Sequence, residues 1–281
     1  MKKIILCGGD SWTSGDIIDP ELQSIGVTYV NHSDNDEYRL PKVWPHKLGK
    51  LLNVDVKNCA AAGCSNDTIV RDVMEHTLNL LKNYKNEDIF VIVGWTSPER
   101  KDFYYEYENE SFWETMRPDM FLDKEQHGRI NKKLRNFYES YFLYFWNEKE
   151  YISRYVNQNI YLFSFLSHHK INHLFFDAFY TKKNKNNVLG LHHSYEVQDD
   201  IQLDEHNTAK YFYDLRQKKF KNISFKNFLL NQSPERDKYR KDLWSDTDPH
   251  PTELGHKLWA EELYKDLKDE YNYIKRGFKN D

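Results

Sequence analysis

The chain has 281 residues, a length that a single α/β domain can reach and that can bury a sizeable core. Its 40 basic and 44 acidic residues give a formal net charge of −4, which argues against the basic surface that nucleic-acid binding requires. Aromatic residues make up 16% of the chain, a share that argues against disorder and favours an aromatic-rich core inside a charged surface.

The cysteines and the apolar stretches of the chain indicate the cellular compartment in which the protein is expected. The chain has three cysteines, an odd number, and Cys7 and Cys59 lie in apolar runs where a small buried thiol is the usual interpretation. The apolar stretch after Lys2 and Lys3 is too short for a signal peptide, and no stretch approaches the ~18 apolar residues of a membrane span. We therefore expect a soluble, reduced, cytoplasmic protein that binds neither membranes nor nucleic acid. Its oligomeric state stays open.

Short buried runs alternate with helical patterns along the chain. In chain order, the expected elements are a strand at 3–8, a helix at about 45–52, a strand at 54–58, a helix at about 66–84, a strand at 88–94, a long helix broken once at about 131–167, a strand at 171–179 and a helix at about 252–271. Buried strands that alternate with helices indicate parallel pairing and a three-layer α/β/α sandwich.

Two regions interrupt this alternation and are expected to be insertions, at about 100–130 and 180–245, in one domain spanning residues 1–281. The first is aromatic and acidic, without clear periodicity. Its aromatic side chains are expected near the rim of a site, to stack on a sugar or cover an acyl chain, or else to form a packed cap over a sheet edge. The second is rich in Lys and Asn, and a solvated excursion without chemistry is expected at 180–240.

Small residues follow each of the first three expected strands, at 8–15, 60–65 and 94–97. Sites in open parallel sheets form at the carboxyl ends of the strands, so these three loops are expected to share one pocket. The first loop carries a serine, Ser11, between glycines. Near the other end of the chain, Asp248 and His250 lie just ahead of a helical pattern. A serine, a histidine and an aspartate are the components of a nucleophilic hydrolase.

Four motifs in order resemble those of the SGNH (GDSL-type) hydrolases. They are Gly9-Asp10-Ser11 with Gly15, the helix beginning Trp44-Pro45, the segment Asn58 to Asn66 that contains Gly63, and Asp248-Pro249-His250-Pro251 followed by Gly255-His256. The resemblance covers roughly residues 1–100 and 240–270. It implies a flavodoxin-like SGNH hydrolase fold with a parallel sheet of about five strands.

The resemblance also implies a site and an activity. Ser11 would be the nucleophile, His250 the base and then the acid, and Asp248 the group that orients the imidazole. The backbone amides of Ser11 and Gly63, with Thr96, would face the oxyanion. Neither a metal nor another cofactor is needed. The implied activity is that of an esterase acting on a small-molecule or glycan ester, with a carbohydrate O-acetyl ester as a plausible substrate class.

Two departures from the family pattern stand out. Thr96 occupies the place where these hydrolases have an asparagine that donates to the oxyanion. Loss of one such donor costs about 10²–10³ in rate. In these hydrolases two residues separate the aspartate from the catalytic histidine, and Thr247 occupies that position here. Either Asp248 or Asp246 must therefore orient the His250 imidazole. The short turn at Pro249 favours Asp248.

Structural roles compete with these assignments. Ser11 can be an N-cap or loop residue, Gly63 a turn glycine with positive φ, and Thr96 a plain loop residue. His256 is expected to pack at the first turn of the last helix. Three functions follow: an esterase, a weakly active or non-catalytic binding or assembly protein, and an acyltransferase with an alcohol acceptor.

Overall fold

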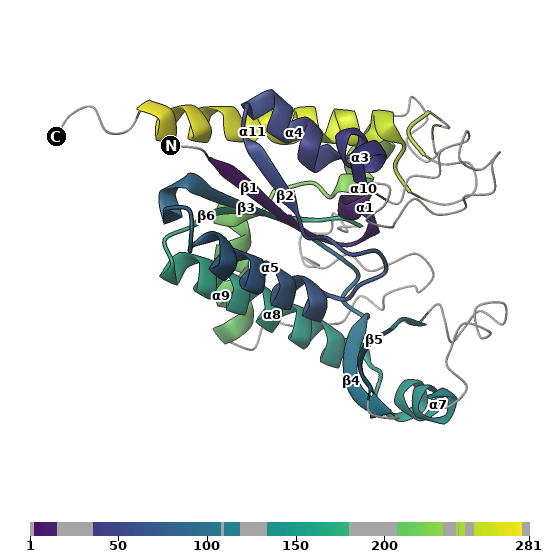
Figure 1. The fold of residues 1–281 in the computed structure, drawn as a ribbon. Coiled ribbons are helices and arrows are strands. Elements are labelled where there is room, and N and C mark those ends of the chain that lie inside the picture. Colours follow the sequence, from purple (N-terminus) through teal and green to yellow (C-terminus); the bar gives the residue numbers. More distant parts are fainter. Residues whose placement is uncertain are drawn as a thin grey trace.

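The computed structural model describes residues 3–15, 36–107, 110–118, 134–179, 207–232, 240, 242–244 and 250–276. Its centre is a parallel sheet between two layers of helices (Figure 1). In spatial order its strands are β2 (Asp55–Asn58), β1 (Ile4–Gly8), β3 (Ile89–Trp95) and β6 (Asn172–Asp177). All three pairings are parallel. Because β6 is the fourth strand of this sheet in chain order, the spatial order is 2-1-3-4, which is that of flavodoxin-like sheets.

Helices cover both faces of the sheet. One layer holds α4 (Trp44–Leu52), α10 (Phe225–Asn231) and α11 (Glu253–Arg276), and the other holds α5 (Asn66–Leu80), α8 (Glu148–His168) and α9 (Asn207–Lys219). Shorter helices are α1 (Ser11–Ser14), α3 (Asp36–Arg39), η2 (Leu40–Lys42) and η3 (Asn86–Asp88). The predicted three-layer α/β/α sandwich with a parallel sheet is confirmed.

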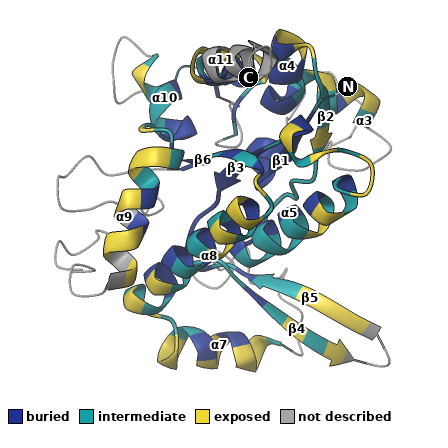
Figure 2. Cartoon of the chain, turned by 90° about the vertical axis from the view of Figure 1, so that its left-hand side faces the viewer, coloured by how far each residue is buried: buried dark blue, intermediate teal, exposed yellow. Residues whose placement is uncertain are grey.

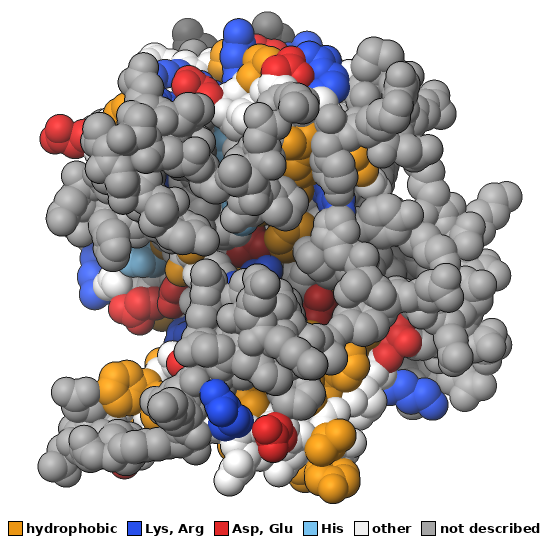
Figure 3. Space-filling model, turned by 90° about the vertical axis from the view of Figure 1, so that its right-hand side faces the viewer, with side chains coloured by type: hydrophobic (Ala, Val, Ile, Leu, Met, Phe, Trp, Pro, Cys, Tyr) orange, Lys and Arg blue, Asp and Glu red, His pale blue; other side chains and the backbone are white. Residues whose placement is uncertain are grey.

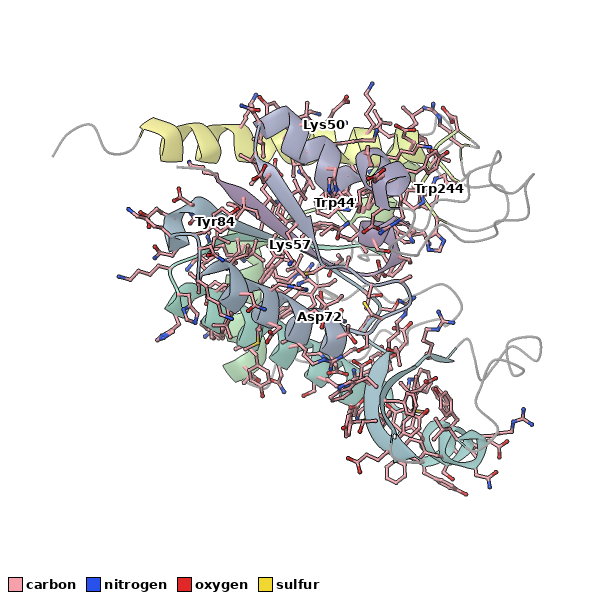
Figure 4. The ribbon with its side chains drawn as sticks, in the orientation of Figure 1. Trp44, Lys50, Lys57, Asp72, Tyr84 and Trp244 are labelled. Carbon is pink, nitrogen blue, oxygen red and sulfur yellow. The ribbon has the colours of Figure 1, made fainter. Side chains whose placement is uncertain are left out.

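The alternation of side chains along β1 builds two separate cores. Ile5 and Cys7 pack in the core under α4 and α11, whereas Ile4 and Leu6 pack in the core against α5 and α8. Successive side chains of a strand point to opposite faces, so one buried strand supplies both layers. Buried residues accordingly lie on the inward sides of the helices (Figure 2), and Trp44 points from α4 toward the sheet (Figure 4).

The sheet has four strands in the described part of the chain, where about five were predicted. Beside β6, at the position of a fifth strand, a single parallel bridge joins Phe175 and Phe220. The Lys221 amide donates to the Phe175 carbonyl at 2.9 Å. Lys221 is followed within four residues by the start of α10, so the pairing does not extend beyond this bridge.

The expectation of a solvated excursion at 180–240 is wrong for residues 207–232. This segment forms α9 and α10, and Phe212, Phe225 and Leu229 are fully buried in the two cores. Arg216 of α9 also donates to the Asp177 carboxylate at 2.6 Å, at the end of β6. In α9 the apolar residues lie among polar and charged ones, and this polar surround hid their helical period. The apolar residues of α10 form a short run, 225–230, in the sequence. Residues 180–206 lie outside the described residues.

The aromatic region at 100–130 contains a β-hairpin of β4 (Lys101–Tyr107) and β5 (Glu110–Met116), whereas no periodicity was expected there. One face of the hairpin packs on α7 (Arg135–Tyr144), with the rings of Phe103 and Tyr141 at 5.3 Å. The other face exposes Tyr104 and Trp113, whose rings lie 5.2 Å apart. The predicted break in the long helix is confirmed, since α7 ends before α8 begins.

Candidate active site

The loops after β1, β2 and β3 lie together at the carboxyl edge of the sheet, at the right of Figure 1. The chain passes from β1 to β2 on one side and then to β3 on the other, so the topological switch point lies between β1 and β3. Ser11 follows β1, and Thr96 follows β3. Figure 3 views this edge, where acidic and basic side chains are visible close together near the centre of the face.

Asp10 holds Ser11 at the start of a helical turn. It is the N-cap of α1, and its carboxylate accepts the Trp12 amide at 3.0 Å, so Ser11 is the first residue of the turn. Gly9 precedes it without a side chain because a Cβ there would lie 2.3 Å from the Thr13 hydroxyl oxygen. Ser11 is 7% exposed. The serine is therefore fixed by the turn rather than carried on a free loop.

The Ser11 hydroxyl and the His250 imidazole meet across 239 positions of the chain. Ser11 Oγ and His250 Nε2 are 2.8 Å apart, a hydrogen-bond distance. The half-buried imidazole can accept the serine proton whenever Nε2 is unprotonated. The structure thus brings together the serine and the histidine that the sequence analysis singled out.

The loop that carries His250 is held by its flanking residues. Trp244 forms an antiparallel bridge with Pro251, and the Thr252 amide donates to the Leu243 carbonyl at 3.0 Å. The buried ring of Trp244 packs 5.3 Å from that of Trp12 in α1, at the end of the molecule shown on the right in Figure 4. These contacts tie the histidine loop to the serine turn.

Asp246 and Asp248, the predicted acids, lie outside the described residues, so their assignment stays a prediction.

Gly63 lies on the adjacent loop in a left-handed conformation, with φ of 69°. This conformation favours glycine and matches the expectation of a turn. The loop is fastened to the serine loop, since the Ala61 amide donates to the Gly9 carbonyl at 3.1 Å and Asn58 Nδ2 donates to the Thr13 carbonyl at 2.8 Å. The loop of the predicted oxyanion amide is thereby held against the loop that carries Ser11.

Thr96 is buried, and its hydroxyl donates to Asp10 Oδ2 at 2.6 Å. A hydroxyl has one proton to donate. In this arrangement the Thr96 proton is donated to Asp10 and not to an oxyanion, which was the role predicted for Thr96 from the sequence. The Thr96 backbone is held on both sides by Asn66, which donates from Nδ2 to the carbonyl at 3.1 Å and accepts the amide at 3.0 Å. Thr96 and Asn66 together fix the Asp10 carboxylate from the β3 side.

Arg100 completes the surroundings of Asp10 and was missed by the sequence analysis. Its Nη1 lies 3.7 Å from Asp10 Oδ2 and donates to the Cys64 carbonyl at 3.2 Å. Arg154 in turn donates to the Arg100 carbonyl at 2.7 Å. Asp10 is fully buried, and a buried carboxylate needs such partners. No spacing in the sequence links Arg100 to Asp10, because their contact depends on the pairing of β1 with β3.

The aromatic hairpin begins and ends at the site. Asp102, near its base, accepts hydrogen bonds from Ser65 Oγ and Thr115 Oγ1 at 2.7 Å, from Thr68 Oγ1 at 2.5 Å and from Arg71 at 3.2 Å. Ser65 is also the N-cap of α5. The hairpin is therefore fixed to the helix that follows the Gly63 loop.

His256 packs at the first turn of α11, as predicted. It is fully buried, and its Nδ1 accepts the Trp44 amide at 3.3 Å. Burial, followed by the nearby charges of His250 and Lys47, lowers its pKa to about 3. The neutral ring can accept the Trp44 amide at the start of α4. Among the described residues, no contact joins His256 to Ser11.

Two further properties concern the described residues. Within the described ranges, no three His, Cys, Asp or Glu side chains form a group that could hold a metal ion. None of the helices in that part of the chain combines the length and the apolar character that crossing a membrane takes.

Comparison with known proteins gives one matching family model and several similar solved structures. A family model described as a family of unknown function (DUF6071) matches residues 28–217. No curated protein matches the chain.

Similar solved structures include three esterases and lipolytic proteins. The psychrotrophic esterase EstA from Pseudoalteromonas sp. is 10% identical over 96% of this chain and 100% of that chain, with a TM-score of 0.45. A lipolytic protein of the G-D-S-L family from Veillonella parvula is 12% identical over 94% and 97%, with a TM-score of 0.43. Phospholipase A1 from Streptomyces albidoflavus is 13% identical over 94% and 99%, with a TM-score of 0.39.

Proposed function

We propose a function for this chain, which belongs to the family of unknown function DUF6071: it is a serine hydrolase that cleaves an acyl ester through Ser11 and His250. The observation that carries the proposal is the 2.8 Å contact between Ser11 Oγ and His250 Nε2. A nucleophile within hydrogen-bond reach of a base is the minimal arrangement for acyl transfer from an ester. The second requirement is a place for the oxyanion, and it is supported by the hydrogen bonds that hold the Gly63 loop against the serine loop.

The reaction proceeds in two halves. His250 takes the Ser11 proton as the oxygen attacks the ester carbonyl, and the amides of Ser11 and Gly63 stabilise the charge on the carbonyl oxygen. The intermediate collapses, the alcohol leaves with the proton from His250, and the acyl group stays on Ser11. Water, deprotonated by the same imidazole, then releases the acid and restores the serine. Asp248 or Asp246 orients the imidazole.

A glycan ester is the substrate class that the exposed Tyr104 and Trp113 favour, because aromatic rings at a site rim can stack on sugar rings. The hairpin that carries them is fixed by Asp102 beside the Gly63 loop. Acyl transfer to an alcohol uses the same first half-reaction and differs only in the acceptor. Measuring free acid released from an acetylated sugar, with and without an alcohol acceptor, separates hydrolysis from transfer.

The Ser11→Ala variant tests the proposal. It is expected to reduce the turnover of p-nitrophenyl acetate by about 10⁴-fold or more, because the acyl-enzyme cannot form. The Ser14→Ala variant is a matched control, since Ser14 is another buried serine of the same helical turn. Equal rates for wild type and Ser11→Ala would exclude the proposed enzymatic function and would favour a binding or assembly protein.

A further inference from the structure

We infer that Thr96 is a positioning residue that acts on Ser11 through Asp10, an inference that rests on the function proposed above. The Thr96 hydroxyl donates to the Asp10 carboxylate, and the same carboxylate caps the helical turn that begins at Ser11. These two bonds join the end of β3 to the nucleophile. Thr96 therefore influences the reaction by fixing the position of Ser11, without contact with the substrate.

The turn that carries Ser11 depends on its cap. α1 is only four residues long, and an isolated helix of that length is unstable in water. Asp10 Oδ1 accepts the Trp12 amide at 3.0 Å, and the Asp10 carbonyl accepts the amides of Thr13 and Ser14 at 2.9 and 2.8 Å. The position of Ser11 is thus set by the conformation of the residue before it.

The same cap leaves the Ser11 amide available for the reaction. The first amides of a helix have no partner within it, and the Asp10 side chain binds the second of them, that of Trp12. The first, that of Ser11, donates to no residue in the described part of the chain. In the proposed function this amide donates to the oxyanion. A shift of Asp10 would therefore displace both the nucleophilic oxygen and one oxyanion donor.

Thr96 fixes the second oxygen of the Asp10 carboxylate. Its Oγ1 donates to Asp10 Oδ2 at 2.6 Å, whereas Arg100 Nη1 lies 3.7 Å from that oxygen, beyond hydrogen-bond distance. Thr96 is itself held in place, since Asn66 binds both its amide and its carbonyl. Asp10 is fully buried, and a buried carboxylate requires partners. Without the Thr96 proton, the carboxylate is expected to turn toward Arg100 and change the angle of the cap.

The Thr96→Val variant tests this role, because it removes the proton that Asp10 accepts and nearly keeps the shape of the side chain. With p-nitrophenyl acetate, kcat is expected to fall by about 10- to 10²-fold with little change in KM, the size of effect that a displaced reacting group produces. Thr96→Ser, which keeps the hydroxyl, should stay within a few fold of wild type. Thr77→Val is the matched control, since Thr77 is a buried threonine of α5, and it should keep the wild-type kcat.

A double-mutant cycle with Asp10→Ser separates positioning from direct donation to the oxyanion. Serine can still cap the turn but has no second oxygen for Thr96 to bind. If Thr96 acts through Asp10, adding Thr96→Val to Asp10→Ser should change kcat by no more than about 2-fold. If Asp10→Ser does not fold, Asp10→Asn replaces it, because its amide nitrogen needs no proton from Thr96.

Three results would overturn the inference. Thr96→Val could keep the wild-type kcat while its stability to urea falls, which would show a purely structural role. It could lower kcat by the same factor with and without Asp10→Ser, as a donor to the oxyanion would. Thr96→Ser could be as slow as Thr96→Val. If Thr96→Val does not fold, Thr96→Ala takes its place in each comparison. Activity that survives in Ser11→Ala would instead refute the proposed function.

Discussion

The His250→Ala variant is expected to hydrolyse p-nitrophenyl acetate about 10²- to 10⁴-fold more slowly than wild type, the contribution typical of a positioned general acid–base group. His250 Nε2 is within 2.8 Å of Ser11 Oγ, and no other histidine of the described residues is recorded in contact with that oxygen. Without the imidazole, the serine must lose its proton to water. The loss should fall on kcat, since the small ester makes few binding contacts.

His168→Ala is the control for this variant, because His168 is exposed at the end of α8. It should retain the wild-type rate. Imidazole added to His250→Ala should restore part of the activity in a saturable way, since the variant leaves a space next to Ser11. A His250→Ala enzyme as fast as His168→Ala would show that another group serves as the base.

The second large effect concerns stability and pH. The folded pKa of His256 is about 3, below its ordinary value of 6.5, so the folded protein keeps this group neutral where the unfolded chain protonates it. The unfolded state then binds more protons between these two values, and the free energy of unfolding falls as the pH decreases through that window. From pH 7 to pH 5 the expected loss from His256 is about 2 kcal/mol.

Urea unfolding at the two pH values measures this loss, and the His256→Gln variant isolates it. Glutamine does not titrate and can still accept the Trp44 amide that His256 Nδ1 accepts at 3.3 Å. His173, whose pKa burial lowers to about 4, contributes in the same window and is unchanged in the variant. The variant should therefore lose about 2 kcal/mol less than wild type between pH 7 and pH 5. Equal losses would contradict a buried neutral His256.

The strands and the loops of the candidate site can be located from the sequence because those signals are local. Buried runs of five to seven residues mark β1 and β3, and small residues after each strand mark the loops at the carboxyl edge. Ser11 and His250 were singled out by residue type and motif order. That they meet could be expected only from the resemblance, since no local pattern encodes a contact across 239 positions.

Other parts of the structure depend on tertiary contacts that the sequence does not display. The helix α9 has few apolar residues, and it is stabilised by burial of Phe212 and by the pairing of Arg216 with Asp177. The Thr96 position was noticed, but its bond to Asp10 requires the pairing of β1 with β3.

In the proposed function, a histidine from the far end of the chain makes Ser11 nucleophilic. The most direct measurement is labelling with a fluorophosphonate, a reagent that reacts with activated serines, followed by mass spectrometry of the labelled peptide. The account predicts one modification, on Ser11, in the wild-type protein and a much slower one in His250→Ala. A label on a different serine, or labelling of Ser11 at the same rate in both proteins, would contradict it.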